Sequence, residues 1–198
     1  MFMLFALLLS ASEPAMAADP NKAHPHKGIA TKFKKPTPTT MTAAEIKILK
    51  QEKAVRKQIK NSTGGIGVAI MDVRADQKTV WRVITDYGNY PKYIKQMKKT
   101  EIYNANGNKM FVRFVLDATV KTVEYYIEHD LHRDEGYLTW TLDYSRKSDL
   151  DDSCGFWYIY PSPDNPGMTR VEYSVDLRLS GWIPKFVENM LANTLVWN

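Results

Sequence analysis

The residues best suited to bind a small molecule are aromatic residues and one histidine at alternate positions in the second half of the chain. They are Tyr125, His129, Trp140, Tyr144, Trp157 and Tyr173. Alternate residues of a strand point to one face of a sheet. Because Tyr and Trp combine an apolar ring with one polar atom, such a face suits an apolar ligand with a polar head. We expect these residues to line a pocket, opposite Phe186 and Met190 of a predicted C-terminal helix.

His129 is the titratable group of this set that is best suited to take part in binding or acid–base chemistry. Surrounded by apolar positions, it is able to orient a ligand or act as a general base. The alternative is a buried histidine that donates to a backbone carbonyl. The whole set likewise fits a filled core with satisfied tyrosine hydroxyls. The sequence leaves both alternatives open.

Two pairs of histidines are candidates for metal binding. His24 and His26 form a pair without an obvious third ligand, in a Pro-containing stretch, which favours solvated side chains. His129 and His132 are three apart, so on a strand they point to opposite faces and do not chelate one ion.

An acidic turn resembles a calcium loop, in the order Asp149, Asp151, Asp152, Ser153. Calcium loops of the EF-hand type require Gly at the sixth place and Glu at the twelfth, where this chain has Cys154 and Tyr160. We expect a solvated turn. Cys154 is the single cysteine, which excludes an internal disulfide and indicates a buried, inert thiol. No cofactor is predicted.

Composition and charge exclude several classes of protein. The chain has 198 residues, 44% hydrophobic and 25% charged, which is typical of one folded domain with extensions. The net charge is +5, but residues 18–60 alone contain 11 basic and 3 acidic residues. The remainder is therefore mildly acidic, and no nucleic-acid partner is expected.

The N-terminal region predicts export. An apolar run, 1–9, precedes Ala15-Met16-Ala17, the small-x-small pattern of a cleavage site, so residues 1–17 are expected to be a signal peptide. The mature protein would be exported, and periplasmic in a Gram-negative host.

Residues 18–63 are predicted to form a basic linker and an amphipathic helix. Thr42 is a candidate N-cap with Glu45 three positions later, and the helix pattern runs to Lys60 with Val55 and Ile59 on its apolar stripe. Such a helix is suited to weak contact with an anionic membrane surface, or to packing on the body with its lysines in water. No protein partner is indicated.

From residue 64 to 198 the pattern becomes mainly alternating and predicts one domain. A strand is expected at 66–73, followed by helices at 76–87 and 90–94. Further strands are expected at 99–105, 109–118, 121–133, 137–145, 155–161 and 169–179, before a helix that begins at Pro184.

This order resembles the START-like, polyketide cyclase and coenzyme Q-binding superfamily. The residues that carry the resemblance are Val80-Trp81, Thr85-Asp86-Tyr87, Tyr90-Pro91-Lys92-Tyr93-Ile94, Thr100-Glu101-Ile102-Tyr103, Thr169-Arg170-Val171-Glu172-Tyr173 and Gly181-Trp182-Ile183-Pro184. The resemblance implies an α+β helix-grip fold, in which a curved antiparallel sheet wraps around a long C-terminal helix. It implies little about function, because the superfamily contains carriers, enzymes and receptors.

Three functions follow from these features. The first is a non-catalytic exported carrier of a lipid, quinone or other apolar small molecule. The second is a cyclase or dehydratase acting on a polyketide-like substrate, with His129 and Tyr125 or Tyr173 in acid–base roles. The third is a protein-interaction module with a filled core. The sequence offers no acid and base pair whose spacing demands catalysis, so we expect a binding protein.

Overall fold

A computed structural model describes residues 17–61, 64–117 and 122–178 of the chain. Its helices are α1 (Ala43–Lys50), α2 (Gln77–Ile84) and α3 (Tyr90–Tyr93), with short 3₁₀ turns η1 (Tyr87–Asn89) and η2 (Arg133–Glu135). Its strands are β1 (Val55–Asn61), β2 (Gly64–Val73), β3 (Met97–Asn106), β4 (Lys109–Asp117), β5 (Thr122–His132), β6 (Tyr137–Leu142), β7 (Asp152–Pro161) and β8 (Thr169–Arg178).

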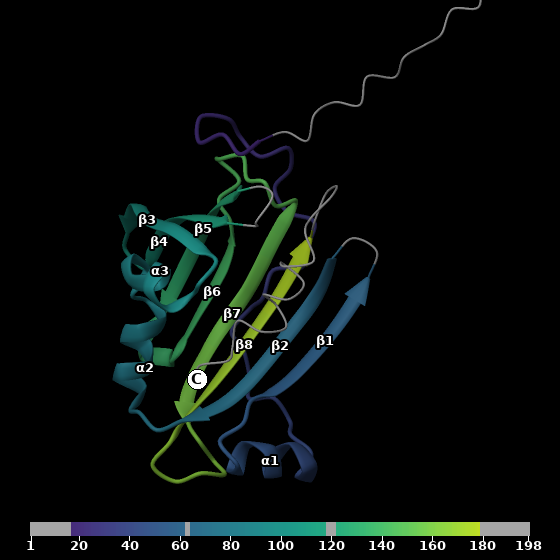
Figure 1. Cartoon of the computed structure of the whole chain (residues 1–198), viewed down its shortest axis with the longest axis vertical. Helices are drawn as coiled ribbons and strands as arrows, with labels where there is room; N and C mark the ends of the chain where they lie inside the picture. Colours follow the sequence, from purple (N-terminus) through teal and green to yellow (C-terminus); the bar gives the residue numbers. More distant parts are fainter. Residues whose placement is uncertain (1–16, 62–63, 118–121, 179–198) are drawn as a thin grey trace, which may run out of the picture.

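All eight described strands form one antiparallel sheet in the order β1-β2-β8-β7-β6-β5-β4-β3. The sheet is strongly curved, with α2 and α3 at the side of β3 to β6 and α1 beneath β1 and β2 (Figure 1). This is a helix-grip-like architecture, as predicted for the sheet. The predicted helix from Pro184 and the predicted signal peptide lie outside the described residues. Within the described ranges, no helix has the length and hydropathy to cross a bilayer.

The predicted helix from Thr42 to Lys60 is wrong in its second half. Its beginning is confirmed, since Thr42 and Glu45 form a capping box at the start of α1. The helix ends at Lys50, and Glu52 takes a left-handed conformation with φ 58°. The following residues form β1, which pairs with β2. Glycine or asparagine is usual at such a helix end, so Glu52 gave no stop signal.

The main core lies on the concave face of the sheet. It joins Val80, Trp81 and Ile84 of α2 with inward residues of β4 to β8. A smaller core on the opposite, convex face consists of Leu49, Val55 and Ile70. The only fully buried residue of α1 is Leu49, so the helix packs on the sheet through this contact, as the second sequence alternative proposed.

Residues 17–42, called here the N-terminal segment, run behind the sheet before reaching α1 (Figure 1). The sequence predicted a linker, but the segment contacts the body repeatedly. Asp19 and Lys147 form an isolated β-bridge, the ring of Phe33 packs 5.1 Å from that of Phe156, and the backbone N–H of Thr39 donates to Glu172. These contacts depend on residues more than a hundred positions apart, which local composition does not reveal.

One glycine permits a close approach in the concave face. A Cβ at Gly155 would lie 2.2 Å from the Trp140 ring and 2.3 Å from the backbone oxygen of Ser174. The indole therefore lies directly over β7 where any side chain would displace it. In this way Gly155 sets the position of the Trp140 ring, one of the two indoles in the predicted site.

Candidate functional site

The concave face carries a continuous series of rings, called here the aromatic row. Its members are Tyr87, Phe114, Tyr125, His129, Trp140, Trp157 and Tyr173. Phe114 and Tyr125 stack at 5.1 Å, and Trp140 and Tyr173 stack at 5.5 Å between ring centroids. His129 joins the two pairs, because its ring lies 6.2 Å from Phe114 and 6.4 Å from Trp140. The structure thus brings together five of the residues that the sequence singled out.

The side chains of the aromatic row are surrounded by protein, yet some of them keep exposed surface. Burial raises the pKa of the Tyr125 and Tyr173 hydroxyls well above the ordinary range. Even so, Tyr125, Trp157 and Tyr173 are only half-buried by accessible surface. These three side chains therefore keep some surface that another molecule can contact.

His129 is 6% exposed and bears one polar atom without a partner. The backbone of Met110, which lies opposite His129 across the β4–β5 ladder, favours the protonated ring, but burial outweighs this effect. The ring nitrogen Nδ1 has no hydrogen-bond partner. Burial lowers the pKa of His129 to about 3, so the ring is neutral at pH 7.

Two neighbours of the predicted site also carry unpartnered polar atoms. The Tyr87 hydroxyl is buried without a hydrogen bond, and the Tyr87 ring lies 4.7 Å from that of His129. Trp81 Nε1 in the same core is likewise unpartnered. The sequence analysis gave Tyr87 as the last residue of a predicted helix and did not include it in the site. Phe114 was missed although it alternates with Val112 and Leu116 on β4, which was a usable signal.

Tyr144 does not join the row. β6 ends at Leu142, so the alternation that assigned Tyr144 to the face of Trp140 stops before it. Its hydroxyl donates to Asp152 over 2.7 Å, and its ring lies 6.0 Å from that of His24 in the N-terminal segment. Phe186 and Met190 lie outside the described residues.

A hollow of about 430 Å³ opens at one rim of the sheet, where the β3–β4 turn meets η2. Lys109, His132, Arg133 and Glu135 give it a polar lining. His132 is paired with Asp130 and stacks on Tyr137, on the opposite side of β5 from His129, as predicted for two strand residues three apart. The charged residues that line this hollow make it different in character from the aromatic row.

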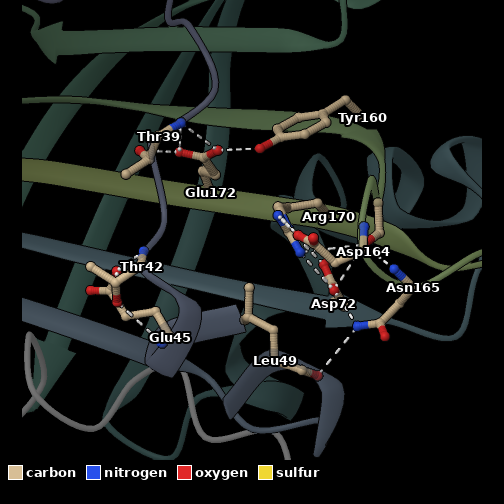
Figure 2. A network of polar contacts seen from close by, with 11 residues as sticks. Thr39, Thr42, Glu45, Leu49, Asp72, Tyr160, Asp164, Asn165, Arg170 and Glu172 are labelled. Atoms are coloured by element: carbon tan, nitrogen blue, oxygen red, sulfur yellow. Dashed lines mark hydrogen bonds and ion pairs between the residues drawn. The ribbon is translucent and has the colours of Figure 1, made fainter. Parts of the chain in front are cut away.

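The convex face carries a different kind of cluster, shown in Figure 2 and called here the convex network: Asp72, Ser162, Asp164, Asn165 and Arg170. Arg170 is 2% exposed and pairs with both oxygens of Asp72 at 2.8 and 3.0 Å. It also reaches Asp164 at 2.8 Å. Hydrogen bonds from Arg170, Ser162 and Asn165 lower the pKa of Asp72 against the opposing effect of burial.

The convex network is tied to the N-terminal half of the chain. Asn165 Nδ2 reaches the Leu49 carbonyl at 3.4 Å as well as Asp72. Beside it, Glu172 is 1% exposed and accepts hydrogen bonds from the backbone and hydroxyl of Thr39 and from the Tyr160 hydroxyl (Figure 2). These polar groups are satisfied by one another, as expected of structural residues.

The acidic turn, predicted to be solvated, is partly buried instead, with Asp149 and Asp151 half-buried and Asp152 and Ser153 buried. Asp152 is 0% exposed, and its carboxylate accepts the backbone N–H groups of Ile29 and Ala30 at 2.6 and 2.7 Å. Cys154 is buried as predicted; its thiol donates to the Thr31 carbonyl at 3.3 Å, and burial raises its pKa to about 12. The turn therefore fixes the N-terminal segment.

His24, His26 and Asp151 form the group of described residues whose ligand atoms are close enough to hold a metal. The third ligand that the sequence lacked is present, and His24 is 8% exposed rather than solvated. However, Nδ1 of each ring accepts a backbone N–H, from Ser148 for His24 and from Gly28 for His26. A neutral ring then carries its proton on Nε2, the atom that faces Asp151 in both rings.

A histidine that binds a metal through Nε2 needs a proton on Nδ1, and this proton is normally donated to an acceptor. Here both Nδ1 atoms face donors. The hydrogen bonding therefore does not fit a metal. The two histidines instead connect the N-terminal segment to the β6–β7 turn by hydrogen bonds.

A family model described as polyketide cyclase/dehydrase and lipid transport matches residues 73–198. The chain belongs to this family. The match begins at the end of β2 and includes every member of the aromatic row, whereas the N-terminal segment, α1 and β1 precede it. A search of curated protein sequences finds no significant match.

Solved structures support the same fold. A STAR-related lipid transfer protein from Xanthomonas axonopodis aligns with a TM-score of 0.53 at 14% identity, covering 71% of this chain and 84% of that one. The protein TTHA0849 from Thermus thermophilus gives 0.52 at 21% identity, with 65% and 84% coverage. The di-domain ARO/CYC StfQ of the steffimycin biosynthetic pathway gives 0.50 at 12% identity, covering 63% of this chain and 40% of that one. The polyketide cyclase/dehydrase and lipid transport fold thus occurs both in lipid transfer proteins and in cyclases.

Proposed function

We propose that the protein is a non-catalytic carrier that binds an uncharged lipid or other apolar small molecule against the aromatic row. The observation that carries this proposal is the half-burial of Tyr125, Trp157 and Tyr173 within an otherwise enclosed face. Aromatic side chains with a few polar atoms are the usual lining of a small-molecule site. The family's lipid transport members are consistent with this role. Export of the mature protein is part of the same proposal.

The enzymatic alternative has less support. A general base works best with a pKa near the working pH, and burial lowers that of His129 to about 3. Burial also raises the pKa of the Tyr125 and Tyr173 hydroxyls, which makes them weak acids. Neutral groups of this kind position a ligand better than they move its protons.

Adjacent aromatic residues of β7 provide a matched test. Trp157 belongs to the aromatic row, whereas its neighbour Tyr158 lies on the opposite face and packs against Tyr160 at 4.7 Å. We expect Trp157→Leu to weaken binding of the uncharged fluorescent probe N-phenyl-1-naphthylamine about tenfold, the equivalent of one lost aromatic contact. Tyr158→Leu should leave probe affinity within about twofold, because it alters only the convex face.

Native mass spectrometry of the unmodified protein provides a second readout. A co-purifying apolar ligand that is lost from the Trp157→Leu variant supports the proposal. Failure of the unmodified protein to bind the probe or any apolar ligand would refute it.

A further inference from the structure

A basic surface lies at the β3 edge of the sheet and is called here the α3–β3 patch. It consists of Lys92 and Tyr93 of α3, Lys95 of the following turn, and Lys98 and Ile102 of β3. The three lysines are exposed, and none of them forms an ion pair with any residue that the structure describes. Tyr93 and Ile102 are 49% and 48% exposed, which makes them two of the four large apolar side chains open to solvent in the described ranges.

The α3–β3 patch adjoins the aromatic row. The Tyr90 ring, also in α3, lies 5.3 Å from that of Tyr87 and 6.2 Å from that of Phe114, which are both members of the row. The Thr100 hydroxyl donates to the Tyr87 carbonyl, so β3 is tied to the same region. The surface that carries the lysines is therefore next to the proposed ligand-binding face.

The positive charge of this edge is not neutralised by its neighbours. Residues 92–102 contain four lysines and one acidic residue, Glu101. Glu101 is paired with Lys99 at 2.7 Å and lies 3.5 Å from Arg113. The lysines of the patch are thus left without a counter-charge. An exposed surface that combines such lysines with a tyrosine and an isoleucine is suited to an anionic bilayer, where the lysines meet phosphates and the amphipathic ring lies at the interface.

Helix α1 has a similar charge in a different place. Lys47, Lys50 and Lys53 are exposed and also lack an ion pair within the described chain, beside Ile48 at 38% exposure. They lie beneath β1 and β2, whereas α3 lies beside β3, the opposite edge of the sheet (Figure 1). A ligand that enters or leaves the aromatic row passes closer to the α3–β3 patch than to α1.

We infer that the α3–β3 patch docks on the surface of an anionic lipid bilayer, so that the carrier meets the membrane with the edge that adjoins the aromatic row. The lysines provide the attraction, and Tyr93 and Ile102 provide apolar contact among the headgroups. The choice of this edge over α1 rests on the proposed function. A neutral bilayer offers no counter-charge, and a nucleic acid offers charge but no hydrocarbon for Ile102.

Co-sedimentation of the full-length protein with lipid vesicles tests the contact. We expect binding to vesicles of phosphatidylcholine mixed with phosphatidylglycerol, and no binding to phosphatidylcholine alone. The triple variant Lys92→Gln, Lys95→Gln, Lys98→Gln should bind the mixed vesicles about a hundredfold more weakly, taking about fivefold for each lysine at an anionic surface. Tyr93→Ser keeps every charge and should also weaken binding, because it removes the interfacial ring.

The matched control removes the same charge from α1 through Lys47→Gln, Lys50→Gln and Lys53→Gln. Binding should change by less than about threefold, because these positions lie at the other edge, beyond the Debye length of about 10 Å. An equal loss in the two triple variants, or a larger loss in the α1 variant, would overturn the inference. Binding to a DNA oligonucleotide without binding to mixed vesicles would overturn it as well.

Probe binding separates this inference from the carrier proposal. Both triple variants should bind N-phenyl-1-naphthylamine with the affinity of the unmodified protein, which also shows that they are folded. If the unmodified protein binds the probe but not the mixed vesicles, the docking surface is refuted and the carrier proposal stands. If it binds the vesicles through the α3–β3 patch but never binds the probe, the docking surface stands and the carrier proposal is refuted.

Discussion

Two groups of buried residues, one on each face of the sheet, differ in how their polar atoms are paired. On the convex face, Arg170, Asp72 and Glu172 are nearly inaccessible, and each has several hydrogen-bond partners. On the concave face, His129 and Tyr87 are equally buried, yet each keeps a polar atom unpartnered. Burial alone thus does not identify a functional residue. The number of hydrogen bonds that the protein leaves unmade is the more informative quantity.

The largest effect is expected from breaking the convex network. Arg170→Met removes the cation and leaves Asp72 and Asp164 without it, which should lower the free energy of unfolding by about 3–5 kcal/mol. The control is Arg74→Met, which removes an exposed pair with Glu52 and should cost less than about 1 kcal/mol. Urea unfolding of both variants measures the difference. Equal losses would contradict the structural role assigned to the convex network.

A second effect comes from pH and tests the concave face. His129 has its pKa lowered from 6.5 to about 3, so folding keeps the ring neutral while the unfolded chain takes up a proton below pH 6.5. Stability is therefore complete above this pH and is lost as pH falls, by about 1.4 kcal/mol per unit, or about 2 kcal/mol at pH 5. The pKa of His24 is also lowered by burial, and it acts in the same direction.

Unfolding in urea at pH 7 and pH 5 measures this slope. His129→Leu should remove its share of the loss, whereas His132→Leu should retain it. An unchanged pH dependence in His129→Leu would show that His129 is not held neutral by the fold.

A smaller effect is expected where the N-terminal segment meets the convex face. Glu172→Gln replaces an acceptor of Thr39 with an amide and should cost about 1–3 kcal/mol. It should also expose residues 18–42 to limited proteolysis, which the unmodified protein should resist. Glu135→Gln is the control, because Glu135 holds the same segment through an exposed pair with Lys35. If the segment is cleaved rapidly in the unmodified protein, it is the separable linker that its composition suggested.

The smallest effect concerns Glu52. Its φ of 58° costs a non-glycine residue about 1 kcal/mol, and Arg74 offsets part of this through an exposed pair. Glu52→Gly and Glu52→Ala both lose the pair, but only glycine relieves the backbone. The glycine variant should therefore unfold at a higher urea concentration than the alanine variant, by about 1 kcal/mol. If the glycine and alanine variants were equally stable, the left-handed backbone of Glu52 would not be strained.

The parts of the fold that sequence could predict are those set by local alternation. Strands β3 to β5, β7 and β8 lie within a few residues of their predicted bounds. The alternation in their sequences marks them as strands, although β3 is mostly exposed and β8 is buried on both faces. β1 was mistaken for helix because Val55 and Ile59 are four apart, a spacing that shares a face in both a helix and a strand.

Some residues of the candidate site could likewise be predicted from local alternation, and others could not. His129, Trp140 and Tyr173 could be predicted, because one parity rule places them. Tyr144 was misplaced because β6 ends at Leu142, where Asp143 begins a turn by accepting the backbone N–H of Ser145, a local signal that the prediction overlooked. The contacts of His24 and Thr39 with the body could not be predicted, because they join positions more than a hundred residues apart. Long-range hydrogen bonds produce no periodic pattern in the amino-acid sequence.

The attachment of the N-terminal segment has a mechanical consequence. Its anchors follow one another along the chain, at Asp19, His24, Ile29, Thr31 and Thr39, before the capped start of α1. A pulling force applied at residue 17 would load these contacts one at a time, as in peeling, rather than all together as in shear. Each contact would pass the load into the β6–β7 turn or into strands β7 and β8 before α1 and β1 are pulled. A tether at the N-terminus would therefore act first on the attachment of this segment.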